Sequence, residues 1–130
     1  MKRTINLTLL LFLAIFSFSC NTKSQETAVK VLTPMEFKEK SLNQLIIDIR
    51  TPQEFNQGHI QGAININYFD STFLDQVSKY EKSTTLYLYC RSGNRTSSAS
   101  SQITALGFKK VYDLQGGIVN WERNNLEVKK

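Results

Sequence analysis

The chain has few of the residues that build metal centres, disulfide frameworks and nucleotide sites. Its 130 residues include two cysteines and one histidine. The sequence has no Cys-x-x-Cys pair, no cluster with metal-ligand spacing, no glycine motif of the nucleotide-binding kind and no internal repeat. We therefore expect neither a metal nor a cofactor.

A large excess of charge of one sign is also missing. The formal net charge is +5, from 16 basic and 11 acidic residues. Lys2 and Arg3 belong to a segment that we expect to be removed, which leaves 14 basic residues against 11 acidic ones. Such a small surplus argues against a nucleic-acid partner, and it is compatible with a site that attracts small anions.

A hydrophobic run long enough to span a membrane is absent too, although the chain begins with a shorter one. The basic start Met1-Lys2-Arg3 is followed by an apolar run over residues 5–18 that three polar residues interrupt. This run is shorter than the roughly 20 residues that a spanning helix needs, and the pattern is typical of a signal peptide. A plain N-terminal anchor helix is the alternative.

The run ends in Phe16-Ser17-Phe18-Ser19-Cys20, which resembles a bacterial lipoprotein signal, in which the cysteine is lipid-modified and begins the mature chain. The resemblance implies a signal peptide at residues 1–19, a lipidated N-terminus at Cys20 with a tether to residue 28, and a domain at residues 29–130. Ser17 and Phe18 depart from the commonest form of the signal, so a secreted soluble form is the alternative. We expect an exported, lipid-anchored domain on the cell envelope, facing the periplasm or the cell exterior. With Cys20 lipidated, Cys90 has no disulfide partner.

Short apolar runs alternate with helical patterns along the rest of the chain. Strands are predicted at residues 29–32, 45–49, 63–66, 86–89 and 111–114, and helices at 33–40, 51–57, 69–80 and 96–106, with a short one that carries Trp121. The sequence Thr-Pro-x-Glu opens the first two helices, as in a capping box with proline at the first helical position. This order predicts one α/β domain, with a mostly parallel central sheet covered by helices on both faces.

Cys90 lies where the strand at residues 86–89 is expected to turn into the helix at residues 96–106. A loop that contains Gly93 can curl so that its N–H groups point inward, towards one centre. These donors and the positive end of the helix would hold an anion together with Arg91 and Arg95. Thiol pKa values fall from about 8.5 towards ~3.5–7.5 in such surroundings, which favours a reactive thiolate. A buried structural cysteine is the alternative.

Charged residues follow the strand at residues 45–49. Asp48 and Arg50 lie at its carboxyl end, the edge where open α/β sheets place their ligands. We expect them to support the loop and not to contact the substrate. Glu54 either caps its own helix or pairs with an arginine of the loop. His59, in a glycine-flanked turn, is interpreted as structural, and Trp121 as a packing residue.

Three stretches together resemble the rhodanese-like sulfurtransferases. The first is Cys90-Arg91-Ser92-Gly93-Asn94-Arg95-Thr96, which is similar to the active-site loop of that family. The second runs from Asp48 to Ala63, and the third from Gly107 through Gly116-Gly117 to Trp121. They occur in the order that the family has, and they extend over most of the chain between Val31 and Trp121.

The resemblance implies a sulfurtransferase in which the Cys90 thiolate takes sulfane sulfur from thiosulfate or a persulfide and passes it to a thiol or cyanide. Arg95 and the loop N–H groups would stabilise the developing negative charge, and Arg91 would steer the anionic donor. The loop itself would be formed by Ser92, Gly93, Asn94 and Thr96. The partners implied are small sulfur-containing anions, a thiol or persulfide acceptor and, through the lipid, a membrane.

Two other functions stay open. A cysteine phosphatase or arsenate reductase uses the same strand, loop and helix arrangement, but places the arginine six positions after the cysteine. Here Arg95 is the fifth residue after Cys90 and Thr96 is the sixth. A non-enzymatic persulfide carrier or binding module would need the same cysteine as the enzyme, so the sequence does not separate the two.

Overall fold

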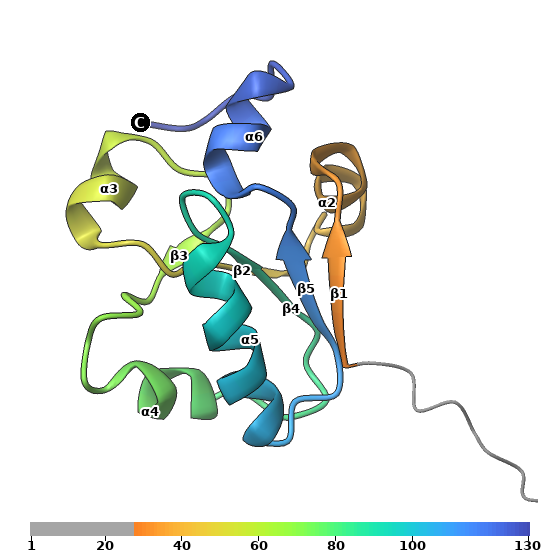
Figure 1. The fold of residues 1–130 in the computed structure, drawn as a ribbon, viewed down its shortest axis with the longest axis vertical. Coiled ribbons are helices and arrows are strands. Elements are labelled where there is room, and N and C mark those ends of the chain that lie inside the picture. Colours follow the sequence, from red (N-terminus) through yellow and green to blue (C-terminus); the bar gives the residue numbers. More distant parts are fainter. Residues whose placement is uncertain (1–27) are drawn as a thin grey trace, which may run out of the picture.

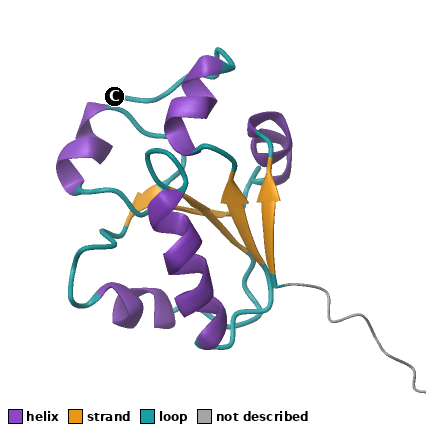
Figure 2. Cartoon of the chain, viewed as in Figure 1, coloured by secondary structure: helices purple, strands orange, loops and turns teal. Residues whose placement is uncertain are grey.

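The computed structural model describes residues 28–130, so the expected signal peptide and Cys20 lie outside the described residues. Five strands and five helices follow one another along this part of the chain (Figures 1 and 2). The elements are β1 (Val29–Leu32), α2 (Pro34–Lys40), β2 (Leu45–Asp48), α3 (Pro52–Gln57), β3 (Ile64–Asn65), α4 (Phe73–Ser78), β4 (Leu86–Tyr89), α5 (Asn94–Ala105), β5 (Val111–Leu114) and α6 (Gly117–Arg123). Within residues 28–130 no helix combines the length and the apolar character needed to cross a membrane.

The strands form one sheet in the order β1-β5-β4-β2-β3, and each neighbouring pair is parallel. The sheet confirms the predicted α/β architecture. Because the strands are parallel, all their carboxyl ends meet at one edge, where open α/β sheets bind ligands. β4 is the middle strand, and its last residue, Tyr89, delivers Cys90 to that edge.

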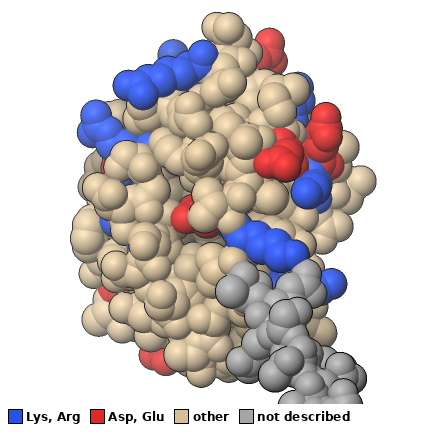
Figure 3. Space-filling model, turned by 45° about the vertical axis from the view of Figure 1, so that its right-hand side comes forward, with Lys and Arg blue, Asp and Glu red and all other residues tan. Residues whose placement is uncertain are grey.

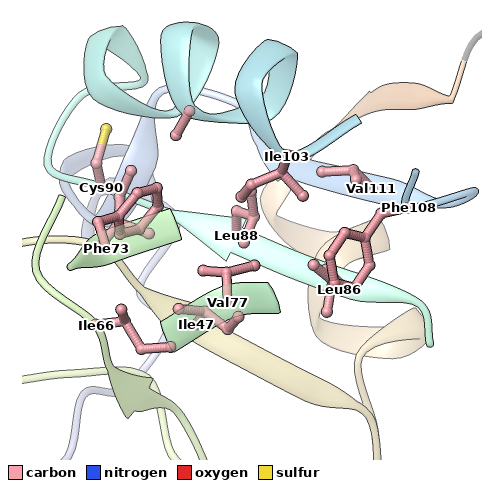
Figure 4. Close-up of a cluster of buried hydrophobic side chains, with 12 residues drawn as sticks. Ile47, Ile66, Phe73, Val77, Leu86, Leu88, Cys90, Ile103, Phe108 and Val111 are labelled. Atoms are coloured by element: carbon pink, nitrogen blue, oxygen red, sulfur yellow. The ribbon is translucent and has the colours of Figure 1, made fainter. Parts of the chain in front are cut away.

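Each face of the sheet carries its own apolar core. One core joins Leu86 and Leu88 of β4 to α4 and α5, and Cys90 lies at one end of it, away from Phe108 (Figure 4). The other core joins Tyr87 and Tyr89 to α2 and α6. All four residues of β4 are therefore buried, as expected for a strand that is covered on both sides.

Two helices begin with the predicted capping boxes. In α2 the Thr33 side chain accepts from the Glu36 N–H, and the Glu36 carboxylate accepts from the Thr33 N–H. Thr51 and Glu54 repeat this arrangement at the start of α3. Each box satisfies N–H groups that have no partner within the first turn of a helix.

The prediction for α4 was wrong at its start. A helix was expected from Phe69 to Tyr80, but α4 begins at Phe73 and ends at Ser78. The Asp70 carboxylate accepts from both the N–H (2.8 Å) and the hydroxyl (2.7 Å) of Thr72, which stabilises a turn in place of the first helical turn. Phe69 consequently leaves the core and is 66% exposed.

Other boundaries differ by one or two residues. The strand expected at residues 63–66 is reduced to Ile64–Asn65, and α5 begins at Asn94, two residues before the expected start. Positive and negative side chains are interspersed on the face shown in Figure 3, in keeping with the small net charge.

Candidate active site

The predicted loop surrounds the sulfur of Cys90 with polar groups. Gly93 has a left-handed conformation (φ +98°) as the N-cap of α5, and its N–H donates to Cys90 Sγ (3.1 Å). The Thr96 hydroxyl lies 3.7 Å from the same sulfur. Cys90 is 1% exposed and belongs to an apolar core, while its sulfur faces an N–H group, a hydroxyl and the start of a helix. Two of these groups favour a negatively charged sulfur, because the Gly93 N–H and the start of α5 present positive dipole ends.

Two carbonyl groups at the start of the loop are bound to α6. The Ile118 N–H donates to Cys90 O (3.0 Å), and the Val119 N–H donates to Arg91 O (3.2 Å). The first turn of α6 can come this close because residue 117 is glycine. Gly117 has φ +61°, and a Cβ atom there would lie 2.4 Å from Arg91 O and 2.5 Å from Cys90 O. The carbonyls of Cys90 and Arg91 are thus bound to α6, while the Gly93 N–H donates to the sulfur.

Arg95 is held in place by a carboxylate from α3. Its Nη1 donates to Glu54 Oε2 (2.9 Å) and its Nη2 to Glu54 Oε1 (2.8 Å), in a two-bond arrangement. Hydrogen bonding from Arg95, with burial opposing it, lowers the pKa of Glu54 to about 2. Glu54 also caps α3, so both roles considered for it from the sequence are present in one side chain. The Arg95 guanidinium lies over the Phe69 ring, with its Cζ atom 5.4 Å from the centroid of that ring.

The pKa of Arg95 is raised, first because Glu54 accepts its hydrogen bonds. Burial works against this rise, and the charges of Glu54, Cys90 and Asp48 support it. The cation is therefore permanent, close to Cys90 and oriented by its carboxylate partner.

Asp48 and Arg50 form a second, buried ion pair at the end of β2. Arg50 Nη2 donates to Asp48 Oδ2 (2.6 Å) and to Gly58 O (2.7 Å), and the guanidinium lies over the ring of Tyr89 at 5.6 Å. The Tyr89 hydroxyl accepts from the Ile60 N–H (3.1 Å). Burial and the Asp48 charge raise the pKa of Tyr89, which keeps this hydroxyl neutral. The pair thus connects the residue that follows α3, Gly58, to Tyr89 at the end of β4.

The remaining loop residues differ in exposure. Thr96 is fully buried, whereas Arg91, Ser92 and Asn94 are exposed. Within the described part of the chain, Arg91 has no ion pair. It is therefore available to an incoming anion, unlike Arg95.

Two residues considered for other roles lie outside this arrangement. His59 stacks on Phe55 (3.9 Å between centroids), and its backbone pairs with Lys129. The Trp121 and Phe37 rings form a T-shaped contact, and the Trp121 Nε1–H donates to Glu127 O (2.9 Å). Both contacts are those of packing residues. Among residues 28–130 no group of three or more His, Cys, Asp or Glu side chains is placed to hold a metal ion.

Sequence reasoning did not foresee the surroundings of three further residues, which lie against Arg95, against the loop carbonyls and in the interior of the sheet. Phe69 was expected in the helix over residues 69–80, Gly117 in the third family-like stretch, and Asp113 in the strand over residues 111–114. Asp113 is a charged residue within a four-residue strand and Gly117 is the second of two adjacent glycines, so both left a signal in the sequence. Phe69 left none, because only the folded chain brings it to Arg95.

Comparisons with known proteins agree with one another. A family model described as a rhodanese-like domain matches residues 28–124. The chloroplastic thiosulfate sulfurtransferase 16 of Arabidopsis thaliana is 38% identical over 93 residues, which cover 64% of this chain and 78% of that protein. A thiosulfate sulfurtransferase of Ectopseudomonas mendocina is 31% identical over 93 residues, with 71% and 84% covered. The crystal structure of a rhodanese-related protein from Thermoplasma volcanium matches with a TM-score of 0.69 at 25% identity, over 77% of this chain and 97% of that one.

Proposed function

This chain belongs to the rhodanese-like domain family, and on that basis we propose that it is a sulfurtransferase that carries sulfane sulfur as a persulfide on Cys90. The observation that carries the proposal is the hydrogen bond from the Gly93 N–H to the Cys90 sulfur, at the start of α5 and beside the Arg95 cation. A thiolate in such a place is a nucleophile with its developing charge already compensated.

The reaction has two steps, each of them a displacement at sulfur. The Cys90 thiolate attacks the outer sulfur of thiosulfate; a bond forms between the two sulfurs, the original sulfur–sulfur bond breaks, and sulfite leaves with the electron pair. Cyanide or a thiolate then attacks the outer sulfur of the Cys90 persulfide, and the thiolate is regenerated. Charge balances in both steps, and no general base is needed.

The two arginines have different parts in this proposal. Arg91 is exposed and unpaired within the described residues, so it is suited to attract an anionic donor. Arg95 keeps a fixed orientation through Glu54, so it is suited to stabilise charge at the reacting sulfur. The physiological donor in this proposal is thiosulfate or a persulfide.

The loop supports sulfur transfer over phosphoryl transfer. The short path from Cys90 to α5 brings the Gly93 N–H within 3.1 Å of the sulfur, which suits a single transferred atom. A phosphoryl group needs donors for three equatorial oxygens and room for an in-line leaving group. A persulfide carrier that does not turn over small donors is the second candidate, and it is favoured by the 1% exposure of Cys90.

Intact mass of the purified full-length protein after exposure to thiosulfate tests this function. We expect a gain of one sulfur that is lost when cyanide or a thiol is added. Cys90→Ser should gain none, while Cys20→Ala should load like the wild type. Sulfur on Cys90→Ser would place the carrier elsewhere and overturn the proposal. Loading without turnover of thiosulfate would identify a carrier.

We further propose that the protein is exported and anchored to the cell envelope by a lipid on Cys20. The support is the basic start and short apolar run of residues 1–18, followed directly by Ser19-Cys20. In the producing cell, Cys20→Ala should abolish labelling by a fatty acid and release the protein from the membrane fraction or block its processing. Unchanged fatty-acid labelling of this variant would exclude the lipid anchor.

A further inference from the structure

Phe69 is an exposed aromatic residue that contacts the candidate active site. The residue is 66% exposed, and the Arg95 guanidinium lies over its ring, with Cζ 5.4 Å from the centroid. The face of an aromatic ring attracts a cation that lies within about 6 Å of its centroid. Single exposed apolar side chains are common on protein surfaces, but this one contacts the cation that the proposed reaction uses. The contact therefore connects Phe69 to the chemistry of the site.

Hydrogen bonds hold the backbone on both sides of Phe69. The Asn67 side chain accepts from the Phe69 N–H (3.1 Å), and the Asn67 carbonyl accepts from the Asp70 N–H (3.0 Å). Asp70 in turn accepts from Thr72. The neighbouring Tyr68 packs against one core of the sheet, and its ring centroid lies 5.8 Å from that of Phe69. The ring of Phe69 is thus exposed on a backbone that is held in place, which suits a residue that restrains another side chain.

Arg95 gains from such a restraint because both of its hydrogen bonds go to one carboxylate, that of Glu54. The Arg95 and Glu54 side chains are 19% and 24% exposed. Holding two long, partly exposed side chains in one geometry costs conformational entropy, so the pair by itself keeps some freedom to move as a unit. A ring that comes from a different segment of the chain restricts this movement.

An interior arginine is held by the same combination of groups. The Asp48 carboxylate binds Arg50, and the Arg50 guanidinium lies over the ring of Tyr89 at 5.6 Å. Carboxylate, guanidinium and aromatic ring are therefore combined twice, once in the interior and once at the site. Arg50 is also confined by burial, whereas Arg95 is partly exposed, so the aromatic contact matters more at Arg95.

We propose that Phe69 is a positioning residue whose ring keeps the Arg95 guanidinium in the orientation that stabilises charge on the Cys90 sulfur. The inference rests on the proposed function, because it gives Phe69 a part in the same reaction. Phe69 acts through Arg95 and not on the reacting sulfur itself. Its effect depends on the electron-rich face of the ring, so an aliphatic side chain does not replace it.

The first test is the rate at which Cys90 takes up sulfur from saturating thiosulfate, followed by intact mass on the full-length protein. Phe69→Leu should lower this rate about two- to fivefold, the factor that corresponds to an exposed cation–π contact. The thiosulfate concentration that gives half the maximal rate should not change, because Arg95 acts on the reacting sulfur. Phe69→Tyr keeps an aromatic face and should load at the wild-type rate.

Fluorinated side chains separate the electrostatic role of the ring from its packing. Mono-, di- and trifluorinated phenylalanine at position 69 should lower the loading rate step by step, because fluorine withdraws electrons from the face of the ring. Trifluorinated phenylalanine at position 108 is the matched control, with an unchanged rate. The Phe108 ring also carries a cation, Lys82 (4.3 Å), but lies at the other end of the core from Cys90 (Figure 4).

A wild-type rate in Phe69→Leu, or equal rates across the fluorinated series at position 69, would overturn the proposal. A second measurement needs no sulfur donor: the NMR order parameter of the Arg95 Nε–H bond. It should fall in Phe69→Leu and keep the wild-type value in Phe69→Tyr. An unchanged order parameter in Phe69→Leu would equally exclude the proposal. If the wild type takes up no sulfur, the proposed function fails, and the order parameter still decides whether Phe69 holds Arg95.

Discussion

Helices α2 and α3 begin with nearly the same five residues, yet the molecule uses them differently. Thr33-Pro34-Met35-Glu36-Phe37 and Thr51-Pro52-Gln53-Glu54-Phe55 each form a complete capping box. In α2 the glutamate is exposed. Hydrogen bonds from Thr33 lower its pKa, and the charge of Lys40 adds to this effect. In α3 the glutamate also holds Arg95 beside the reactive cysteine.

The phenylalanines of the two motifs also differ, and here the residue of α2 is the more deeply buried one. Phe37 is fully buried between Tyr87 and Trp121, whereas Phe55 is half-buried and stacks on His59. α2 thus contributes its apolar side chain to the core, and α3 contributes its carboxylate to the site. The shared motif determines where a helix begins, while the surroundings determine which residue of the motif matters.

The largest difference between the helices is expected in stability. Phe37→Ala should lower the free energy of unfolding by about 3–5 kcal/mol, as is usual for a large side chain removed from a packed core. Phe55→Ala should cost clearly less, because its ring is half-buried. Denaturant unfolding of both variants measures the comparison. Equal losses would show that α3 also belongs to the core.

For activity, we expect the substitution in α3 to have the larger effect. Glutamine serves in a capping box as glutamate does, so Glu54→Gln keeps the start of α3 and removes only the charge that orients Arg95. The rate of sulfur loading from thiosulfate should fall about 10–100-fold, because small displacements of a charged group at a reaction centre have effects of this size. Glu36→Gln is the matched control. If both variants load at the wild-type rate, Arg95 does not depend on its partner.

A smaller difference is expected in the stability of the fold at acid pH. The pKa of Glu54 is lowered from 4.5 to about 2, so its ion pair stabilises the fold above pH 4.5, and this contribution is lost as the pH falls towards 2. Wild-type protein should therefore lose more stability over this interval than Glu54→Gln, by less than about 1 kcal/mol since the pair is partly exposed. Parallel stability curves would mean that the ion pair contributes nothing to folding.

Much of the fold could be predicted because its signals are local. The capping boxes marked the starts of α2 and α3, and continuous apolar runs marked the buried strands, with β5 matching residue for residue. The start of α4 could not be predicted from apolar spacing. Phe69 and Phe73 fit one helical face, but the Asp70 carboxylate bound to Thr72 outcompetes the helix at that point.

The site was only partly predictable, since its groups come from distant segments. The loop around Cys90 is contiguous in the sequence, so its chemistry was visible there. Whether Glu54 caps a helix or binds an arginine depends on how α3 lies against α5, and no local pattern contains this. Asp113 was overlooked for the same reason, because its burial beside Leu88 of β4 arises only in the folded sheet.

The contact between α6 and the Cys90 loop also determines when, during synthesis of the chain, the loop is held in place. The ribosome adds Cys90 to the chain before Gly117, and until α6 is made and folded the carbonyls of residues 90 and 91 lack the donors that later hold them. The hydrogen bonds that hold the loop are therefore complete only when α6 lies against it. A nascent or truncated chain that ends before α6 therefore carries the same cysteine in a loop that lacks these two hydrogen bonds.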